Sequence, residues 1–218
     1  MTDQDPLAPR GPAEVAQWRR EVRARLIRER LTMDPKTRQR YGERIVHGFL
    51  EAVGQIRGRT ISAFRPIQGE PDLTPLLETL VSRGGRLALP VVVEAGKPLV
   101  FRAWTPGDPL EPGVWGIPVP PADAPSVIPE VVIAPVVGFD RAGYRLGYGG
   151  GYFDRTLAAL GPGVRFLGAG YVRSALPTIH PQPHDVPMEA VVTEAGIFRP
   201  ASGVLPSVRV EGETYLPP

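Results

Sequence analysis

The segment Val131–Val137 constrains the fold more than any other, because all of its residues are apolar. An apolar run without polar alternation is typical of a strand that other elements cover on both faces. Such strands belong to sheets in which strands and helices alternate along the chain. We therefore expect an α/β sandwich with a largely parallel sheet.

Helical patterns precede this strand. Residues spaced by three and four predict one stripe of a helix that begins near Pro12; they are Val15, Trp18, Val22 and Leu26. The pair Asp34-Pro35 favours a helix start, because aspartate accepts from free amides and proline fits the first turn. We expect this second amphipathic helix to continue to Gly54.

The remaining elements follow from shorter patterns. β-favouring runs predict strands at residues 60–64, 86–93, 99–104 and 165–170. Helical spacing predicts helices at 73–80 and 153–160. Repeated proline and glycine at 105–129 exclude regular structure there, and a loop this long suggests binding.

The size and composition favour one domain. With 218 residues, 42% of them hydrophobic, the chain can bury a substantial core without subdividing. We expect a single domain over residues 13–195, a flexible N-terminus at 1–12 and a loosely attached, proline-rich tail at 196–218.

Charge and cysteine content exclude several functions. A formal charge of +2 from 25 basic and 23 acidic residues gives no global field toward nucleic acid or an anionic membrane. The chain has no cysteine, which excludes disulfides, thiolate catalysis and thiolate metal sites. No apolar stretch reaches the roughly 20 residues that cross a bilayer, and the start lacks a secretory signal. We expect a cytoplasmic protein.

A glycine-rich run follows the buried strand and precedes a predicted helix. Residues 138–154 read GFDRAGYRLGYGGGYFD. Ligands favour the carboxyl edge of α/β sheets, and a helix start offers free amides to an anion. The glycines at 147, 149, 150 and 151 allow close approach of the backbone, Arg145 can pair with a phosphate, and Asp154 offers an oxygen suited to magnesium.

Other interpretations of this run stay open on the residues alone. The glycines also fit a tight turn, and Asp154 also fits a helix cap. The run is not a Walker loop, because the Gly-Lys pair is missing, and it lacks the acidic ribose partner of a dinucleotide fingerprint.

The run from Gly138 to Arg155 closely resembles the signature of the 5-formyltetrahydrofolate cyclo-ligase family. The resemblance extends in order from about Trp18 to Thr193 and includes IQGE at 67–70, WGIP at 115–118 and His184-Asp185. It implies a single-domain three-layer α/β/α fold with a mixed sheet. It also implies that 5-formyltetrahydrofolate becomes 5,10-methenyltetrahydrofolate while ATP, with magnesium, becomes ADP and phosphate.

The resemblance assigns ATP contacts to two parts of the chain. Arg19 and Arg23 match the basic positions of the family's first ATP-contacting segment, whereas Arg20, Arg25 and Arg28 fit a solvated face. The second part is the run Arg145, Leu146, Gly147, Tyr148, Gly149, Gly150, Gly151 and Phe153. In the family the formyl oxygen attacks the γ-phosphate and the neighbouring amine closes the ring. We expect Arg145, as a loop arginine outside the core, and Tyr152 to act in catalysis.

The folate contacts are also assigned by resemblance. Glu70 matches the acid that binds substrate, and Trp115 matches an aromatic residue of the folate pocket. Tyr148 and Tyr152 match positions beside the formyl group and the pterin. The plainer alternatives are a turn residue for Glu70, a partly exposed core aromatic for Trp115, and packing against a strand for the two tyrosines.

The metal site needs a second carboxylate besides Asp154. The family places an aspartate just before the last strand, and we match it to Glu189, with Asp185 as the alternative. The three histidines are too scattered for a zinc triad.

Two other kinds of function stay open. The same cradle could serve a phosphotransferase acting on another small molecule, or a non-catalytic relative that binds nucleotide or folate. We expect 5-formyltetrahydrofolate as the partner, with no nucleic acid and no membrane, and a monomer.

Overall fold

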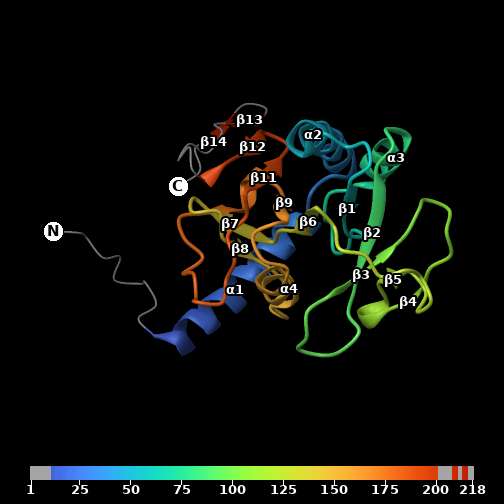
Figure 1. The fold of residues 1–218 in the computed structure, drawn as a ribbon. Coiled ribbons are helices and arrows are strands. Elements are labelled where there is room, and N and C mark those ends of the chain that lie inside the picture. Colours follow the sequence, from blue (N-terminus) through green and yellow to red (C-terminus); the bar gives the residue numbers. More distant parts are fainter. Residues whose placement is uncertain (1–10, 201–207, 211–212, 216–218) are drawn as a thin grey trace.

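The structure, a computed structural model, describes residues 11–200, 208–210 and 213–215. Its centre is a seven-stranded sheet with helices on both faces (Figure 1). Along the sheet the strands are β12 (Gly196–Phe198), β11 (Ala190–Thr193), β9 (Arg165–Ala169), β6 (Val131–Pro135), β1 (Thr60–Ser62), β2 (Arg86–Val91) and β3 (Val100–Ala103). Pairing is parallel from β11 through to β2, and the edge strands β3 and β12 are antiparallel. The expected three-layer, largely parallel α/β sandwich is confirmed.

The helices cover the two faces of the sheet. Helices α2 (Pro35–Val53) and α3 (Thr74–Ser82) lie together on one face, and α4 (Tyr152–Leu160) lies on the other (Figure 1). Helix α1 (Pro12–Leu31) packs against a small sheet of β10 (Ala175–Leu176), β7 (Gly138–Asp140) and β8 (Arg145–Leu146). None of the helices in the described ranges is long and apolar enough to cross a membrane.

The helix boundaries follow from local sequence. Asp34 caps α2 by accepting a 2.9 Å hydrogen bond from the amide of Thr37, and Gly54 ends that helix with a φ of 71°. Helix α1 starts at Pro12 and buries Val22 and Leu26, as its stripe predicts. Both helix starts are confirmed.

Strand β6 shows why its sequence is almost wholly apolar. Val131 and Ile133 join the core cluster beneath α2 and α3, whereas Val132 and Ala134 join the cluster beneath α4. Alternate side chains of a strand point to opposite faces, so a strand covered twice needs apolar residues at every position.

The loop expected at 105–129 contains more order than the sequence predicts. Strands β4 (Glu111–Pro112) and β5 (Pro118–Val119) pair there, and a 3-10 turn, Val114–Gly116, joins them. The absence of regular structure predicted for this segment is therefore wrong. Both β4 and β5 are edge strands of this short ladder, and an edge strand tolerates proline because one of its sides needs no hydrogen-bond donors.

The chain ends also differ from expectation. The predicted boundary at 196 is wrong, because residues 196–198 form β12 and Phe198 is buried against Phe139, with ring centroids 5.9 Å apart. Farther on, β13 (Val208–Val210) pairs with β14 (Glu213–Tyr215), and the rest of the predicted tail lies outside the described residues. At the other end Pro12 already belongs to α1, while residues 1–10 of the predicted flexible N-terminus lie outside the described residues.

Two glycines of α2 should respond oppositely to alanine. A Cβ at Gly48 would lie 2.7 Å from Cγ1 of the buried Val192, whereas a Cβ at Gly42 would meet nothing nearer than 3.7 Å. We expect Gly48→Ala to lower the free energy of unfolding by about 1–3 kcal/mol. Gly42→Ala should raise it by about 0.5–1 kcal/mol, because alanine restricts the unfolded chain. Urea unfolding of both variants measures the difference, and a shift of the same sign in both would contradict this packing.

Candidate functional site

The site lies where several chain segments leave the carboxyl side of the central sheet. Glu70 follows β1, and the glycine-rich segment follows β6 through the β7–β8 hairpin and leads into α4. Helix α1 lies against both segments, since its arginines donate to Gln68 and Gly147. These segments lie at the carboxyl edge of the sheet, where the sequence leads us to expect the site.

The β7–β8 hairpin holds the start of the glycine-rich segment. Oδ1 of Asp140 accepts from the amides of Ala142 and Tyr144 at 3.0 and 3.1 Å, and Oδ2 accepts from the amide of Ile179 at 3.0 Å. Gly143 has a φ of 84°, which this tight turn requires. The turn is thereby fixed to the chain near residue 179.

Arg145 lies in β8 and its side chain is only 4% exposed. The expectation that it is a loop arginine outside the core is therefore wrong. Its Nη1 and Nη2 donate to the two carboxylate oxygens of Asp154 at 3.1 and 2.9 Å, and its guanidinium lies 4.9 Å from the ring centroid of Phe166. Burial lowers the pKa of Arg145, against the pull of Asp154. The two groups form a buried bidentate ion pair.

The glycines between this arginine and α4 leave backbone exposed. A Cβ at Gly147 would meet no atom within 4 Å, and Gly149 has a φ of 98° that favours glycine. Gly151 is the N-cap of α4, in the left-handed region, and supplies no side-chain hydrogen bond to the first turn. The α4 N-terminus therefore presents amides that no capping side chain satisfies.

Two arginines of α1 reach this region differently. Nε of Arg23 donates to the carbonyl of Gly147 at 2.6 Å, and its guanidinium lies beside Gly149. Burial and the neighbouring Arg19 and Arg20 lower the pKa of Arg23, so positive charge is concentrated here. Arg19 instead donates to the carbonyls of Ile179 and His180 and pairs with Asp185 at 2.5 Å. Of these two arginines, only Arg23 contacts the glycines directly.

The two candidate second carboxylates lie in different surroundings. Asp154 accepts a 3.1 Å hydrogen bond from the amide of Val186, the residue after Asp185. Burial opposes ionisation of Asp185, but bonds from Arg19 and the Gln182 amide hold its pKa below the ordinary value. The structure thus brings Asp185 close to Asp154.

Glu189 belongs to another part of the structure. It pairs with Arg165 at 2.9 and 2.5 Å, and Arg165 also donates to the carbonyls of Ala52 and Val53 at the end of α2. Phe166, the next residue, faces Arg145 instead. Glu189 is therefore directed to the α2 side of the sheet, and Asp154 lies on the α4 side. Among the residues that the structure describes, no group of three or more His, Cys, Asp and Glu side chains could hold a metal.

Glu70 and Tyr148 meet in a buried cluster. The Tyr148 hydroxyl donates to Oε1 of Glu70 at 2.5 Å and accepts from Nη2 of Arg30 at 2.6 Å. Burial raises the pKa of Glu70, against the hydrogen bond from Tyr148. Burial also raises the pKa of Tyr148, so its phenol stays protonated and can donate. These two predicted substrate residues are in direct contact.

The aromatic residues divide between surface and core. Trp115 is 70% exposed, and its ring lies edge-on to that of Tyr152, with centroids 5.8 Å apart. Leu146 is buried against α1, and Phe153 packs toward the core beside Arg145. The structure therefore leaves Leu146 and Phe153 only their backbones to offer a nucleotide.

Sequence reasoning missed two arginines. Arg30 continues the buried stripe of Val22 and Leu26 by one more step of four, a signal that an arginine there faces inward. Arg155 donates to the carbonyl of Gly150 and lies 5.2 Å from the centroid of Tyr152, and its Nε is buried without a hydrogen-bond partner. Its place one turn into α4 gave no comparable signal.

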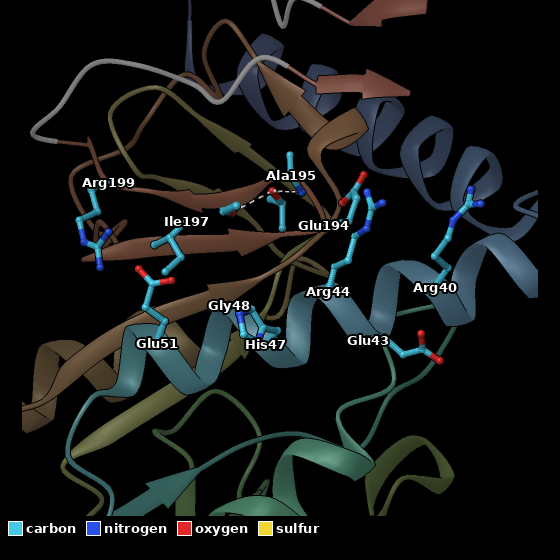
Figure 2. Close-up of a pocket in the computed structure, with 12 residues that line it drawn as sticks. Arg40, Glu43, Arg44, His47, Gly48, Glu51, Glu194, Ala195, Ile197 and Arg199 are labelled. Carbon is cyan, nitrogen blue, oxygen red and sulfur yellow. Dashed lines mark hydrogen bonds between the residues drawn. The ribbon is translucent and has the colours of Figure 1, made fainter. Parts of the chain in front are cut away.

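A separate groove lies between α2 and the β11–β12 edge (Figure 2). It has a volume of about 600 Å³ and contains none of the predicted site residues. Its arginines, Arg40, Arg44 and Arg199, are matched by the acids Glu43, Glu51 and Glu194. A groove with balanced charge has no preference for a phosphate, so its size alone does not make it the site.

Comparison with known proteins shows to which family this chain belongs. Residues 15–194 match the 5-formyltetrahydrofolate cyclo-ligase family. Proteins named 5-formyltetrahydrofolate cyclo-ligase from Mycolicibacterium smegmatis and Escherichia coli are 32% and 31% identical; each alignment covers 79% of this chain, and 92% and 99% of the relative.

A solved structure has the same fold. The Aquifex aeolicus 5,10-methenyltetrahydrofolate synthetase superposes with a TM-score of 0.71 at 26% identity, covering 89% of this chain and 97% of that one. The sequence match spans the glycine-rich segment, Glu70 and both metal candidates. The chain belongs to the 5-formyltetrahydrofolate cyclo-ligase family.

Proposed function

We propose that this enzyme converts 5-formyltetrahydrofolate to 5,10-methenyltetrahydrofolate with ATP and Mg²⁺, releasing ADP and phosphate. The observation that carries the proposal is the uncapped N-terminus of α4, with Arg23 beside its glycines and with Tyr148, in the same glycine segment, bonded to Glu70. The segment that carries the anion donors thus also contacts a polar, partly aromatic cluster. The reaction needs both, because a phosphoryl group must pass to a folate oxygen.

The loop has the properties that a triphosphate requires. Gly147 leaves open space where a side chain would stand, and the first-turn amides of α4, which no capping side chain satisfies, carry partial positive charge. Arg23 adds a cation whose Nε is anchored on Gly147, leaving the rest of its guanidinium for the ligand. Arg19, which the resemblance also assigns to ATP, acts in our proposal by holding Asp185 in place.

We assign Mg²⁺ to Asp154 and Asp185 rather than to Glu189. Magnesium prefers carboxylate oxygens in a tight octahedral arrangement and would supply charge neutralisation at the phosphates. Asp154 keeps a lone pair on Oδ2 that Arg145 and the Val186 amide do not use, and Asp185 precedes that amide. Arg145 thus fixes the orientation of Asp154, and its burial gives it no free donor face for substrate.

The folate half of the site is assigned to four residues. Glu70 would accept from pterin N–H groups, which requires the ionised carboxylate. Tyr148 fixes that carboxylate, and Tyr152 stands at the junction between the glycines and Trp115. The exposed ring of Trp115 is available to cover an aromatic ligand. These side chains would align the formyl oxygen with the phosphate bound at α4.

The overall proposal is tested by turnover of the purified protein. With 5-formyltetrahydrofolate, ATP and magnesium we expect the near-ultraviolet absorbance of methenyltetrahydrofolate to rise and ADP to form in equal amount. Omitting ATP or chelating magnesium should stop both. ATP consumption without the absorbance change would indicate a phosphotransferase acting on another substrate.

The magnesium assignment predicts which carboxylates matter. Asp154→Asn and Asp185→Asn should each raise the magnesium concentration needed for half-maximal activity by about tenfold or more, because loss of one oxygen ligand disturbs the octahedron. Glu189→Gln is the matched control, since its partner is Arg165. Titration of magnesium against activity at saturating ATP decides the matter, and a shift in Glu189→Gln alone would reverse our assignment.

Removing Arg145 should damage stability as well as turnover. Arg145→Ala leaves the Asp154 carboxylate half-buried without its bidentate partner, and breaking such a pair costs about 3–5 kcal/mol. We expect a lower midpoint of chemical unfolding together with loss of activity. Arg83→Ala, at an exposed arginine, is the control. An unchanged midpoint would restore the view that Arg145 is a free phosphate ligand.

Trp115 should affect one substrate only. Trp115→Ala should raise the KM for 5-formyltetrahydrofolate by about tenfold, because an aromatic contact of about 1–1.5 kcal/mol is lost, and leave the KM for ATP nearly unchanged. The residue is exposed, so the fold should persist. Steady-state kinetics with each substrate varied separately measures this, and equal losses for both would refute a folate-specific role.

A further inference from the structure

Arg30 is a buried cation near the candidate substrate site that has no role in the proposed function so far. It is 5% exposed and lies at the inward face of α1. Its Nε donates to the carbonyl of Gln68 at 2.9 Å, and its Nη2 donates to the hydroxyl of Tyr148 at 2.6 Å. One side chain therefore holds two segments that are distant in sequence.

The first of these segments is a turn whose shape needs support. Gln68 has a φ of 47° and Gly69 a φ of 77°, and left-handed backbone at a residue other than glycine is unfavourable. The turn is closed by the amide of Glu70 on the carbonyl of Ile67 at 3.0 Å, and by the amide of Ile67 on Oε2 of Glu70 at 2.8 Å. Arg30 donates to a second carbonyl of the turn, at Gln68. The position of the Glu70 carboxylate thus depends on contacts that include Arg30.

The second segment is the glycine-rich segment, whose Tyr148 connects Arg30 to Glu70 by hydrogen bonds. Tyr148 accepts from the guanidinium and donates to the carboxylate, so cation, phenol and carboxylate form a chain of two hydrogen bonds. Its ring also lies 5.9 Å from the guanidinium carbon. A phenol that accepts from a cation becomes a stronger donor, so the two bonds reinforce each other.

The other titratable groups near Glu70 do not replace this cation. Tyr171 donates to the carbonyl of Gly69 at 3.3 Å, and burial raises the pKa of Tyr171 to about 12, so it stays neutral. Arg38 and Glu194 act on Tyr171 with opposite signs. Arg30 is the cation whose charge lowers the pKa of Glu70, against the burial that raises it.

We propose that Arg30 is a positioning residue for the folate substrate: through Tyr148 and the Gln68 carbonyl it fixes the 67–70 turn, and its charge favours the ionised form of the Glu70 carboxylate. This inference rests on the proposed folate role of Glu70. The ionised form accepts from two pterin N–H groups at once, whereas a protonated Glu70 would offer one acceptor less. Arg30 would thereby contribute to folate selection without touching folate.

The test compares Arg30→Met with Arg28→Met, an exposed arginine of the same helix. Arg30→Met should raise the KM for 5-formyltetrahydrofolate by about tenfold or more, because hydrogen bonds from a charged group are lost. The KM for ATP should change by less than about twofold, and Arg28→Met should leave both values unchanged to that extent.

The pH dependence separates this role from a merely structural one. Glu70 must be ionised to bind, so folate binding is lost as pH falls through its pKa. Removing Arg30 raises that pKa further, and the acid limb of kcat/KM for folate should move to higher pH in Arg30→Met. Arg30→Lys keeps the positive charge. It should return the acid limb of kcat/KM to its wild-type pH, while the KM for 5-formyltetrahydrofolate stays raised. An acid limb that does not move in Arg30→Met would overturn the inference.

Two further variants keep failure of the inference distinct from failure of the proposed function. If Glu70→Gln leaves the KM for folate unchanged, the assigned role of Glu70 is wrong. The Arg30 proposal, which rests on that role, is then wrong as well. If Glu70→Gln weakens folate but Arg30→Met does not, only the Arg30 proposal fails. In a Tyr148→Phe background the effect of Arg30→Met should shrink, because the relay is already cut. Full additivity would contradict the relay.

Discussion

The buried pair of Arg145 and Asp154 is the interaction on which the candidate site depends. It joins β8 to the first turn of α4, so both ends of the intervening glycine segment are fixed to the core. A buried ion pair contributes little net stability when both partners are present but is costly to break, so it acts as a constraint on geometry. Here the constrained geometry is the position of the α4 N-terminus relative to the sheet. Without it, a segment of glycines would have no preferred path.

Helix α1 supplies the second constraint. Its inward arginines hold three separate segments: Arg19 the chain at 179–185, Arg23 the glycine segment, and Arg30 the 67–70 turn. Each contact ends on a backbone carbonyl or on a side chain that itself contacts the site. An arginine can do this because its planar fork offers several donors in fixed directions. A run of charged residues on a helix usually forms a solvated face. In α1 only part of the run does so: Arg25 and Arg28 are exposed, whereas the arginines named above face inward.

The sequence predicted the layers of the fold but not the partners of its charges. Hydrophobic periodicity is local, so Val131–Val137 and the stripe of α1 indicated their elements correctly. The boundary at 196 was wrong because the partner of Phe198 is Phe139, far away in sequence. Arg145 was misplaced for the same reason, since nothing local shows that Asp154 neutralises it in the core.

The second carboxylate illustrates a finer limit. Asp185 and Glu189 both precede β11 and cannot be separated by residue type. What distinguishes them is the face of the sheet on which each lies. Glu189 pairs with Arg165 on the α2 side, whereas Phe166, the next residue after Arg165, faces Arg145 on the other side. The resemblance matched Glu189 and left Asp185, four residues earlier, as the alternative. A match along the sequence does not show toward which face of the sheet a side chain is directed.

The same helix sets the distance between the two halves of the candidate site. Arg23, at the glycine segment, and Arg30, at the Glu70 turn, lie on one face of α1 about two turns apart, or about 10 Å along its axis. A helix holds such a spacing more firmly than loops can, because its backbone hydrogen bonds are satisfied internally. Phosphoryl transfer depends on alignment of donor and acceptor, so a rigid spacer between the anion cradle and the substrate cluster is what the chemistry requires. The arginine-rich helix α1 therefore sets the distance between the glycine segment and the Glu70 turn, and it also supplies positive charge to both.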